Sequence, residues 1–353
     1  MNEISLKIGF WYDENKRKLP WRETRDAYRI WLSEIILQQT RVAQGMDYYM
    51  RFVAAYPNVE ALANAEEDDV LKLWQGLGYY SRARNLWAAA RQVVAWNEEA
   101  GCEEKSRFPQ RYEDLKRLKG VGPYTAVAVA SLSGDEEVAV VDGNVYRVLA
   151  RLLDLDVAID TGKGQKTFQA VADQLLHEAV AEGHTTPRRH NQAMMEFGAL
   201  QCTPNLPHCE DCPVSSHCLA LANKTVELRP VKQGKLKVKE RHFTYIIYIY
   251  KDTLWVHQRG AGDIWQGLWE YVLTEDEQKV GICILEKKHQ LTHQTLYTEF
   301  RVVKLEDDIE DPWQHPAIKA LPQGYVQMKW MDWQKKAVPK LIDAANERLS
   351  VWF

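Results

Sequence analysis

The spacing of apolar residues divides the chain at about residue 240. Before this point apolar positions recur every three or four residues, which is the period of an amphipathic helix. The pattern predicts helices over residues 3–16, 26–39, 42–55, 66–75, 81–98, 111–118, 123–133, 144–154, 164–181 and 188–200. No convincing run of alternating apolar and polar positions interrupts them, so residues 1–222 are expected to form a helical domain.

Beyond residue 240 the apolar period shortens to that of β-strands, with a turn signal at Lys251-Asp252. The pattern predicts strands over residues 243–250, 254–257, 280–286 and 296–305 and a helix over residues 335–349. Polar residues with interspersed lysines predict that residues 223–240 are a linker. Residues 241–353 are therefore expected to form a separate α+β domain.

A glycine-rich turn joins two of the predicted helices. Gly120 and Gly122 flank Val121, and Pro123 follows at a position where proline fits the first turn of a helix. Glycines allow a tight turn and a close approach to a ligand, and the free N–H groups of the second helix form an anion site. A DNA phosphate is the natural occupant, although the motif alone is also typical of an ordinary helix–turn–helix corner.

Composition narrows the possible classes of protein. A chain of 353 residues is long enough for two or three domains with hydrophobic cores. The net charge is −4, so any DNA binding must use a local basic face rather than overall attraction. No apolar run is long enough for a transmembrane helix, and the N-terminal residues lack the layout of a signal peptide. We therefore expect a cytoplasmic protein with no membrane partner.

Four cysteines lie close together near the end of the helical part. They are separated by six, two and five residues: Cys202, Cys209, Cys212 and Cys218. Three prolines keep the intervening loop, residues 202–218, non-helical. Four thiolates at this spacing suit either a [4Fe–4S] cluster or a tetrahedral zinc ion, and the chemistry of the ligands does not choose between them.

The cysteine spacing, behind a glycine hairpin and a downstream Asp142, resembles the endonuclease III superfamily of DNA glycosylases. Within it, five motifs resemble adenine DNA glycosylases: LPWR at 19–22, WLSEIILQQT at 31–40, GLGYY at 76–80, DGN at 142–144 and NQAMME at 191–196. With the cysteines, these motifs cover residues 19–218. The resemblance implies a helix-hairpin-helix fold with an iron–sulfur loop and, more loosely, a Nudix-like C-terminal domain.

The resemblance also implies a function. It predicts a monofunctional DNA glycosylase that excises adenine mispaired with 8-oxoguanine, or with G, during base excision repair. The expected partner is double-stranded DNA that contains A:8-oxoguanine or A:G, and the expected state is a nucleoid-associated monomer. The implied cofactor is a [4Fe–4S] cluster, with zinc as the alternative, and a monovalent cation or calcium ion is a candidate ligand of the hairpin.

Two carboxyl groups suit glycosidic chemistry. Glu34 lies among apolar helical neighbours, so desolvation should raise its pKa and suit it to protonate a leaving base. The alternative for Glu34 is a surface position, and the alternative for Asp142 is a helix N-cap. The resemblance assigns Asp142 to the oxocarbenium or covalent intermediate, which matches the two-carboxylate logic of glycosidases. It places Tyr124 and Asn144 around the nucleophilic water.

Tyr124 also separates two kinds of glycosylase. Bifunctional relatives carry a lysine there, because a Schiff base with the sugar requires an amine. A tyrosine predicts hydrolysis without strand cleavage by β-elimination.

The remaining site residues come from the resemblance alone. The adenine pocket is expected to contain Trp21, Arg22 and Glu196. DNA and the lesion are expected to contact Gln39, Thr40, Leu77, Tyr79, Gly120, Gly122, Leu291, Thr292 and His293. Leu291, Thr292 and His293 stand where the family typically has Phe-Ser-His. This departure puts the preference for the lesion at risk. The alternative is that these residues form a loop without DNA contact.

Three rival functions remain open. An endonuclease III–like pyrimidine or T:G mismatch glycosylase is disfavoured by Tyr124 and by the added C-terminal domain. A lesion-binding protein without turnover is disfavoured by the presence of both carboxyl groups. A nucleotide-pool Nudix hydrolase is disfavoured because no glutamate-rich box follows residues 263–277.

Overall fold

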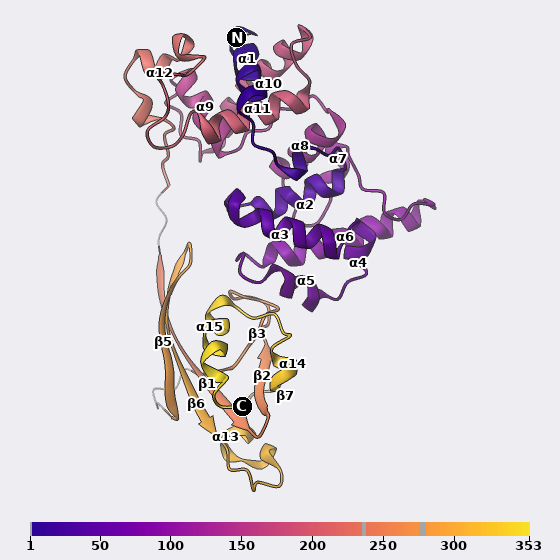
Figure 1. The fold of residues 1–353 in the computed structure, drawn as a ribbon, viewed down its shortest axis with the longest axis vertical. Helices are drawn as coiled ribbons and strands as arrows, with labels where there is room; N and C mark the ends of the chain where they lie inside the picture. Colours follow the sequence, from indigo (N-terminus) through magenta and orange to yellow (C-terminus); the bar gives the residue numbers. More distant parts are fainter. Residues whose placement is uncertain (1, 235–237, 275–279) are drawn as a thin grey trace. The chain divides into compact units, whose positions relative to one another are not determined.

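The computed structural model describes residues 2–234, 238–274 and 280–353 and divides into two compact units. Unit 1 comprises Met1–Ala63 and Ala88–Lys235, and unit 2 comprises Asn64–Trp87 and Leu236–Phe353. In the described ranges, all strands belong to unit 2 (Figure 1). The sequence placed residues 64–87 in the helical domain, whereas their contacts group them with the C-terminal part.

The predicted helices of the first 222 residues are present, most of them to within two residues at each end. They are α1 (Asn2–Asn15), α2 (Ala27–Leu37), α3 (Val42–Ala55), α5 (Glu67–Trp74), α6 (Ser81–Glu99), α7 (Tyr112–Leu115), α8 (Pro123–Gly134), α9 (Gly143–Leu152), α10 (Gly162–Ala181) and α11 (Pro187–Leu200). The short elements η1 (Pro20–Arg22), α4 (Val59–Ala63) and α12 (Leu219–Ala222) were not predicted. Helix α7 ends three residues early, because the chain turns there towards Gly120, whose φ is +73°.

Helix α8 lies at the centre of unit 1. Eight of its twelve residues are buried, and the small side chains of Ala126, Ala128 and Ala130 let neighbouring helices come close. Helices α2, α7 and α11 pack against it. A second core joins α1, α9, α10 and α11 around Phe168 and Phe197. These two cores fix the helices that carry the candidate site.

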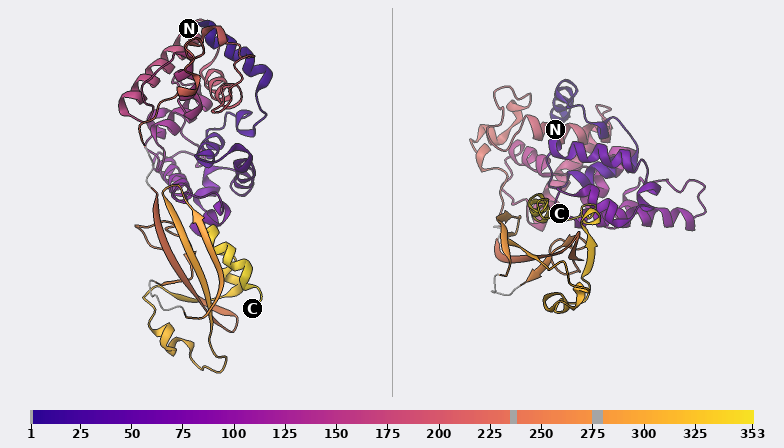
Figure 2. Two further views of the ribbon diagram at one scale, coloured as in Figure 1. Left: turned by 90° about the vertical axis from the view of Figure 1, so that its left-hand side faces the viewer. Right: turned by 60° about the horizontal axis from the view of Figure 1, so that its bottom comes forward.

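Unit 2 is built on a twisted sheet that lies between two apolar cores. Its strands are β1 (Lys239–Tyr250), β2 (Thr253–Gln258), β3 (Trp269–Glu270), β4 (Val272–Thr274), β5 (Ile282–Gln290), β6 (Gln294–Lys304) and β7 (Val326–Lys329). The main path runs β3-β2-β1-β6-β5, with β1 and β6 parallel and β5 and β6 joined as a hairpin. Helix α15 (Lys340–Leu349) covers one face, as Figure 2 shows.

The prediction of a helix over residues 335–349 was wrong for residues 335–339. Helix α15 begins at Lys340, directly after Pro339. Proline disfavours helical backbone in the residue before it and lacks the N–H that an interior helical position needs. Strand β5 also continues to Gln290, four residues beyond its predicted end. In the described part of the chain, no helix is both long and apolar enough to cross a membrane.

The approach of α11 to α9 yields a test of packing. A Cβ atom on Gly198 would lie 2.7 Å from Asn144 Cβ and 2.8 Å from the Asn144 carbonyl oxygen. We expect Gly198→Ala to lower the free energy of unfolding by about 1–3 kcal/mol, because helix backbones must separate. Gly134→Ala is the control, since its Cβ would meet no atom closer than 3.9 Å. Equal urea midpoints for the two variants would contradict this account.

Candidate active site

Glu34 and Asp142 line the same cavity in unit 1. The cavity has a volume of about 240 Å³ and is lined by residues of η1, α2, α8, α9 and α11. Its walls include all the residues predicted for the chemistry and the adenine pocket: Trp21, Arg22, Glu34, Tyr124, Asp142, Asn144 and Glu196. Ile30, Leu37, Leu132 and Met195 supply apolar wall. The arrangement places two carboxyl groups beside a space bounded by both polar and apolar side chains.

Helix α2 brings Glu34 to the cavity. Asp26 caps this helix, and its carboxylate accepts a hydrogen bond from the amide of Tyr28 at 2.9 Å. Burial raises the pKa of Glu34 to about 7, although Tyr124 Oη donates a hydrogen bond to Glu34 Oε2 at 3.3 Å. The charge of Asp142 raises this pKa further. Near neutral pH the carboxyl group therefore carries its proton often enough to act as an acid.

Asp142 caps helix α9. Its Oδ1 accepts hydrogen bonds from the amides of Asn144 at 2.9 Å and Val145 at 2.8 Å, and its Oδ2 accepts one from Asn144 Nδ2 at 2.7 Å. Burial raises the pKa of Asp142, and these three donors oppose the rise. The capping alternative is therefore present in the structure. Capping does not remove the carboxyl group from the cavity, so the two roles are compatible.

Arg147 holds Asn144 in place and was missed by the sequence analysis. Its Nη2 donates to Asn144 Oδ1 at 2.9 Å and to the Gly198 carbonyl at 2.6 Å, and its Nε donates to the Cys202 carbonyl at 2.7 Å. The signal for the first of these contacts is the three-residue spacing on α9, which puts both side chains on one face. The contacts connect Asp142 and Asn144 to the first residue of the cysteine loop.

Two arginines hold Glu196 at the wall of the cavity. Arg17 Nε donates to Glu196 Oε1 at 2.9 Å, and Arg22 Nη2 donates to Glu196 Oε2 at 2.8 Å. Burial alone would raise the pKa of Glu196, but these donors outweigh it and lower the pKa to about 2. The fully buried carboxylate is therefore ionised. Arg17 was not predicted, and its position in a basic run before Trp21 gave no sign of a buried partner.

The glycine hairpin presents the start of α8 to solvent. Gly120 and Gly122 are exposed, and in the described chain no side chain caps the helix at Gly122. Gln92 supports the turn, because it accepts from the Lys119 amide at 3.0 Å and donates to the Arg117 carbonyl at 3.0 Å. Uncapped N–H groups at a helix start favour an anion. The geometry is therefore suited to a phosphate.

The loop after α2 carries two of the residues predicted to contact DNA. Thr40 lines the cavity, and Gln39 is exposed with a φ of +54°. Gln38, which was not predicted, donates to Thr125 Oγ1 at 3.2 Å and ties this loop to α8. Gln39 does not line the cavity, so the structure separates it from the residues of the adenine pocket.

The other predicted contacts to DNA lie in unit 2. The turn after α5 has positive φ at Gly76, Gly78 and Tyr79, and Tyr79 is 42% exposed. Leu77 is only 8% exposed, so in this conformation its side chain is not available to a duplex. Leu291, Thr292 and His293 form the tip of the β5–β6 hairpin. The hydroxyl of Tyr79 hydrogen-bonds with that of Thr292, which brings these two parts of the chain together.

The four cysteines of the loop line one cavity. Its volume is about 30 Å³, and Arg151 closes one side with a hydrogen bond from its Nη1 to Cys202 Sγ at 3.4 Å. A single zinc ion, with bonds of about 2.3 Å, would draw the sulfurs to about 3.8 Å from one another. Of the described residues, these cysteines do not form a set whose sulfurs all lie within 4.8 Å. The thiols that line the cavity are donors that an iron–sulfur cluster or a zinc ion can take.

Comparison with known proteins adds independent information. The model of the HhH-GPD superfamily of base excision DNA repair proteins matches residues 32–173. The adenine DNA glycosylase of Buchnera aphidicola subsp. Schizaphis graminum is 32% identical over 306 residues, which cover 84% of each chain. That of Arabidopsis thaliana is 36% identical over 309 residues, which cover 76% of this chain but only 47% of the plant protein.

A solved structure resembles the helical part. The structure of a thermostable thymine-DNA glycosylase superposes with a TM-score of 0.52 and 27% sequence identity. It covers 62% of this chain and 95% of that protein. The matched part of this chain therefore shares its fold with a protein named as a thymine-DNA glycosylase.

Replacing Glu34 with glutamine tests the burial of its carboxyl group. Folding raises its pKa from 4.5 to about 7, so the folded protein binds this proton more tightly than the unfolded chain does. The contribution of this tighter proton binding to the free energy of unfolding is fully present below pH 4.5 and is lost as the pH rises through about 7. We therefore expect Glu34→Gln to gain stability relative to the wild type between pH about 5 and about 8.

Urea unfolding at several pH values measures this difference. Glu99→Gln, at the exposed end of α6, controls for the substitution itself. A Glu34→Gln effect that is independent of pH would show that the carboxyl group is not desolvated in the folded protein.

Proposed function

Because the chain belongs to the adenine DNA glycosylase family, we propose that it hydrolyses the N-glycosidic bond of adenine mispaired with 8-oxoguanine, or with G, in duplex DNA. One observation carries the proposal. A carboxyl group with a pKa of about 7, Glu34, shares a cavity with a second carboxyl group, Asp142, that is held by three hydrogen-bond donors. The first supplies a proton and the second supplies negative charge.

In the proposed reaction, Glu34 donates its proton to N7 of the adenine ring, which converts the base into a neutral leaving group. The bond to C1′ then breaks with oxocarbenium character, and Asp142 stabilises the cation through a transient covalent adduct. Tyr124 and Asn144 hold the water that completes the hydrolysis. Glu34, which has lost its proton, accepts one from that water.

The adenine pocket is proposed to use the ionised carboxylate of Glu196. Four hydrogen bonds from Arg17 and Arg22 occupy both oxygens of this fully buried carboxylate, so its proposed role is to hold Arg22 at the wall where adenine would bind. Trp21 contributes an apolar wall and is held by an edge contact with Tyr49, at 5.0 Å between ring centroids.

The absence of an amine at Tyr124 supports a hydrolase without lyase activity. A Schiff base needs a lysine or an N-terminal amine near the sugar, and no lysine is among the described residues that line the cavity. The protein should release adenine and leave an intact strand with an abasic site.

DNA contacts are proposed at two places. In unit 1, the hairpin at Gly120 and Gly122 grips a phosphate and is a candidate site for a cation. In unit 2, Tyr79, Thr292 and His293 contact the 8-oxoguanine, since all three are exposed around one hairpin tip. Leu77 would have to leave its buried position to enter the duplex. Unpairing costs a few kcal/mol, which inserted side chains offset.

The cysteine loop is proposed to hold a [4Fe–4S] cluster through Cys202, Cys209, Cys212 and Cys218. When bound, such a cluster supplies iron–thiolate bonds that cross-link the loop, with no redox step in the reaction itself. Unit 2 is proposed to be Nudix-like and non-hydrolytic. The protein is proposed to act as a monomer in the cytoplasm, on nucleoid DNA.

Single-turnover release of adenine tests the proposal. We expect release from A:8-oxoguanine and A:G duplexes, none from T:G or oxidised-pyrimidine duplexes, and no strand cleavage. Asp142→Asn should fold and bind DNA but lose turnover, because asparagine caps a helix about as well as aspartate but carries no charge. Asp26→Asn is a matched control, since it caps α2 outside the cavity.

Wild-type rates in Asp142→Asn would show that this residue only caps its helix. Thymine release from T:G without adenine release would favour the rival mismatch glycosylase instead.

The cofactor is tested by its colour and composition. We expect the purified protein to be brown, with visible absorption and with iron and sulfide in equal amounts. Cys212→Ser should lose the colour, whereas Cys102→Ser, outside the loop, should keep it. A colourless protein that contains zinc would contradict the proposal.

A further inference from the structure

Two backbone hydrogen bonds hold the tip of the β5–β6 hairpin in the described part of the chain. Strand β5 is an edge strand, and the neighbouring strand β1 begins at Lys239, level with Gln294. The Lys239 amide donates to the His293 carbonyl at 2.9 Å, and the Leu291 amide donates to the Gln294 carbonyl at 2.8 Å. Side-chain contacts add to these two backbone hydrogen bonds in setting the position of the tip.

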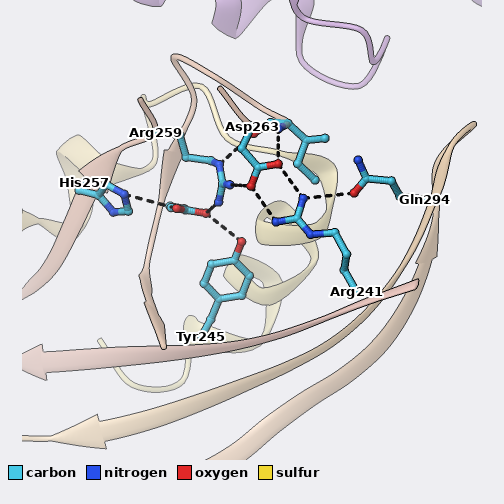
Figure 3. Close-up of polar contacts among 8 residues, drawn as sticks. Arg241, Tyr245, His257, Arg259, Asp263 and Gln294 are labelled. Atoms are coloured by element: carbon cyan, nitrogen blue, oxygen red, sulfur yellow. Dashed lines mark hydrogen bonds and ion pairs between the residues drawn. The ribbon is translucent and has the colours of Figure 1, made fainter. Parts of the chain in front are cut away.

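A chain of polar side chains runs from the core of unit 2 to this tip (Figure 3). It starts at Glu270, which is 1% exposed and accepts a hydrogen bond from Tyr245 Oη at 2.8 Å. Arg259 forms an ion pair with Glu270, and its Nη2 also donates to Asp263 Oδ2 at 2.8 Å. The buried end of the chain therefore anchors Asp263.

Arg241 links Asp263 to the hairpin. Its Nη1 donates to Asp263 Oδ1 at 2.6 Å and its Nη2 donates to Asp263 Oδ2 at 2.7 Å, which is a two-pronged contact. The same Nη1 donates to Gln294 Oε1 at 3.2 Å. Hydrogen bonds from Arg241 lower the pKa of Asp263 to about 2, so the contact stays charged at physiological pH.

Apolar contacts hold the same region in place. The Arg241 guanidinium lies 4.7 Å from the centroid of the Phe243 ring. Trp265, in the loop that carries Asp263, contacts both Phe243 and His289, with ring centroids 6.4 Å and 6.3 Å apart. Leu291 packs against the same core. The inner side of the tip is therefore held by a charged contact and an aromatic one.

We infer that Arg241 and Gln294 are positioning residues for lesion recognition: they set the hairpin tip so that Thr292 and His293 meet 8-oxoguanine. The inference rests on the proposed function and names residues that need not touch DNA. A recognition group works only when it is held close to its productive geometry, and supporting residues supply that restraint. Loosening the tip should slow adenine release opposite 8-oxoguanine and leave adenine release opposite G unchanged, which lowers the preference for 8-oxoguanine.

The test compares adenine release from A:8-oxoguanine and A:G duplexes under single-turnover conditions. Gln294→Ala removes only the contact to the hairpin, and Arg241→Gln removes the two-pronged contact as well. We expect the ratio of the two rates to fall by on the order of tenfold in Arg241→Gln and by less in Gln294→Ala, because a lost charge-assisted hydrogen bond is worth about that factor. Arg241→Lys should recover part of the ratio.

Arg301→Gln is the matched control. Arg301 also lies in the sheet and pairs with Glu299, but it contacts the Val280 and Gly281 carbonyls at the far end of the hairpin. In Arg301→Gln the ratio of the A:8-oxoguanine rate to the A:G rate should equal that of the wild type. Thermal unfolding of all variants separates a loss of stability from a loss of discrimination.

An unchanged ratio in Arg241→Gln would overturn the inference. An equal fall of both rates would also overturn it, since the residues would then support folding or catalysis rather than recognition. A wild-type protein that releases adenine from neither duplex would instead reject the proposed function, and the inference with it.

Discussion

The start of helix α9 is the point on which the candidate site depends. A helix leaves its first N–H groups without partners, and here Asp142 satisfies two of them with one carboxylate oxygen. The second oxygen is held by the side chain of Asn144, which Arg147 holds in turn. The carboxyl group therefore has no freedom to turn away from the cavity. Its position is set by a helix terminus rather than by a flexible side chain.

The environment of each carboxyl group decides which one carries the proton. Both are partly buried, and desolvation alone would raise both pKa values. Asp142 is compensated by three donors, two of them backbone amides, whereas Glu34 receives one side-chain hydrogen bond, from Tyr124. The charge of Asp142 then raises the pKa of Glu34 further. Ionisation of Asp142 and protonation of Glu34 therefore favour each other, which is the distribution that glycosidic cleavage requires.

The sequence predicted the parts of the molecule that depend on local spacing. The helices follow the apolar period. Glu34 and Asp142 were selected through the family resemblance, because the local pattern alone also fitted a surface glutamate and a helix N-cap. Arg17 could not be selected, because its partner Glu196 is distant in the chain. Arg147 had a local signal only for its contact with Asn144, since the Gly198 and Cys202 carbonyls are distant in the chain.

The pairing of distant strands in unit 2 also could not be predicted from the sequence. Alternating residues predict that β1 is a strand, but its parallel register with β6 depends on contacts about fifty residues away. The grouping of residues 64–87 with the C-terminal part has no local signal. The burial of Leu77 has none either, since two flanking glycines suggested a projecting side chain. Pro339 did carry a local signal, and it explains why α15 begins where it does.

Among the described residues, a carboxylate held by the side chains of two arginines is found in each unit: Glu196 with Arg17 and Arg22, and Asp263 with Arg241 and Arg259. Desolvating such charges costs about as much as their attraction returns, so ion pairs of this kind are a poor source of stability. These ion pairs instead fix orientation, because the two N–H donors of a guanidinium group hold the plane of the carboxylate that they bind. Glu196 faces the cavity where a base would bind, and Asp263 supports the hairpin tip. The two pairs therefore fix the orientation of side chains at the cavity wall and beside the hairpin tip more than they stabilise the fold.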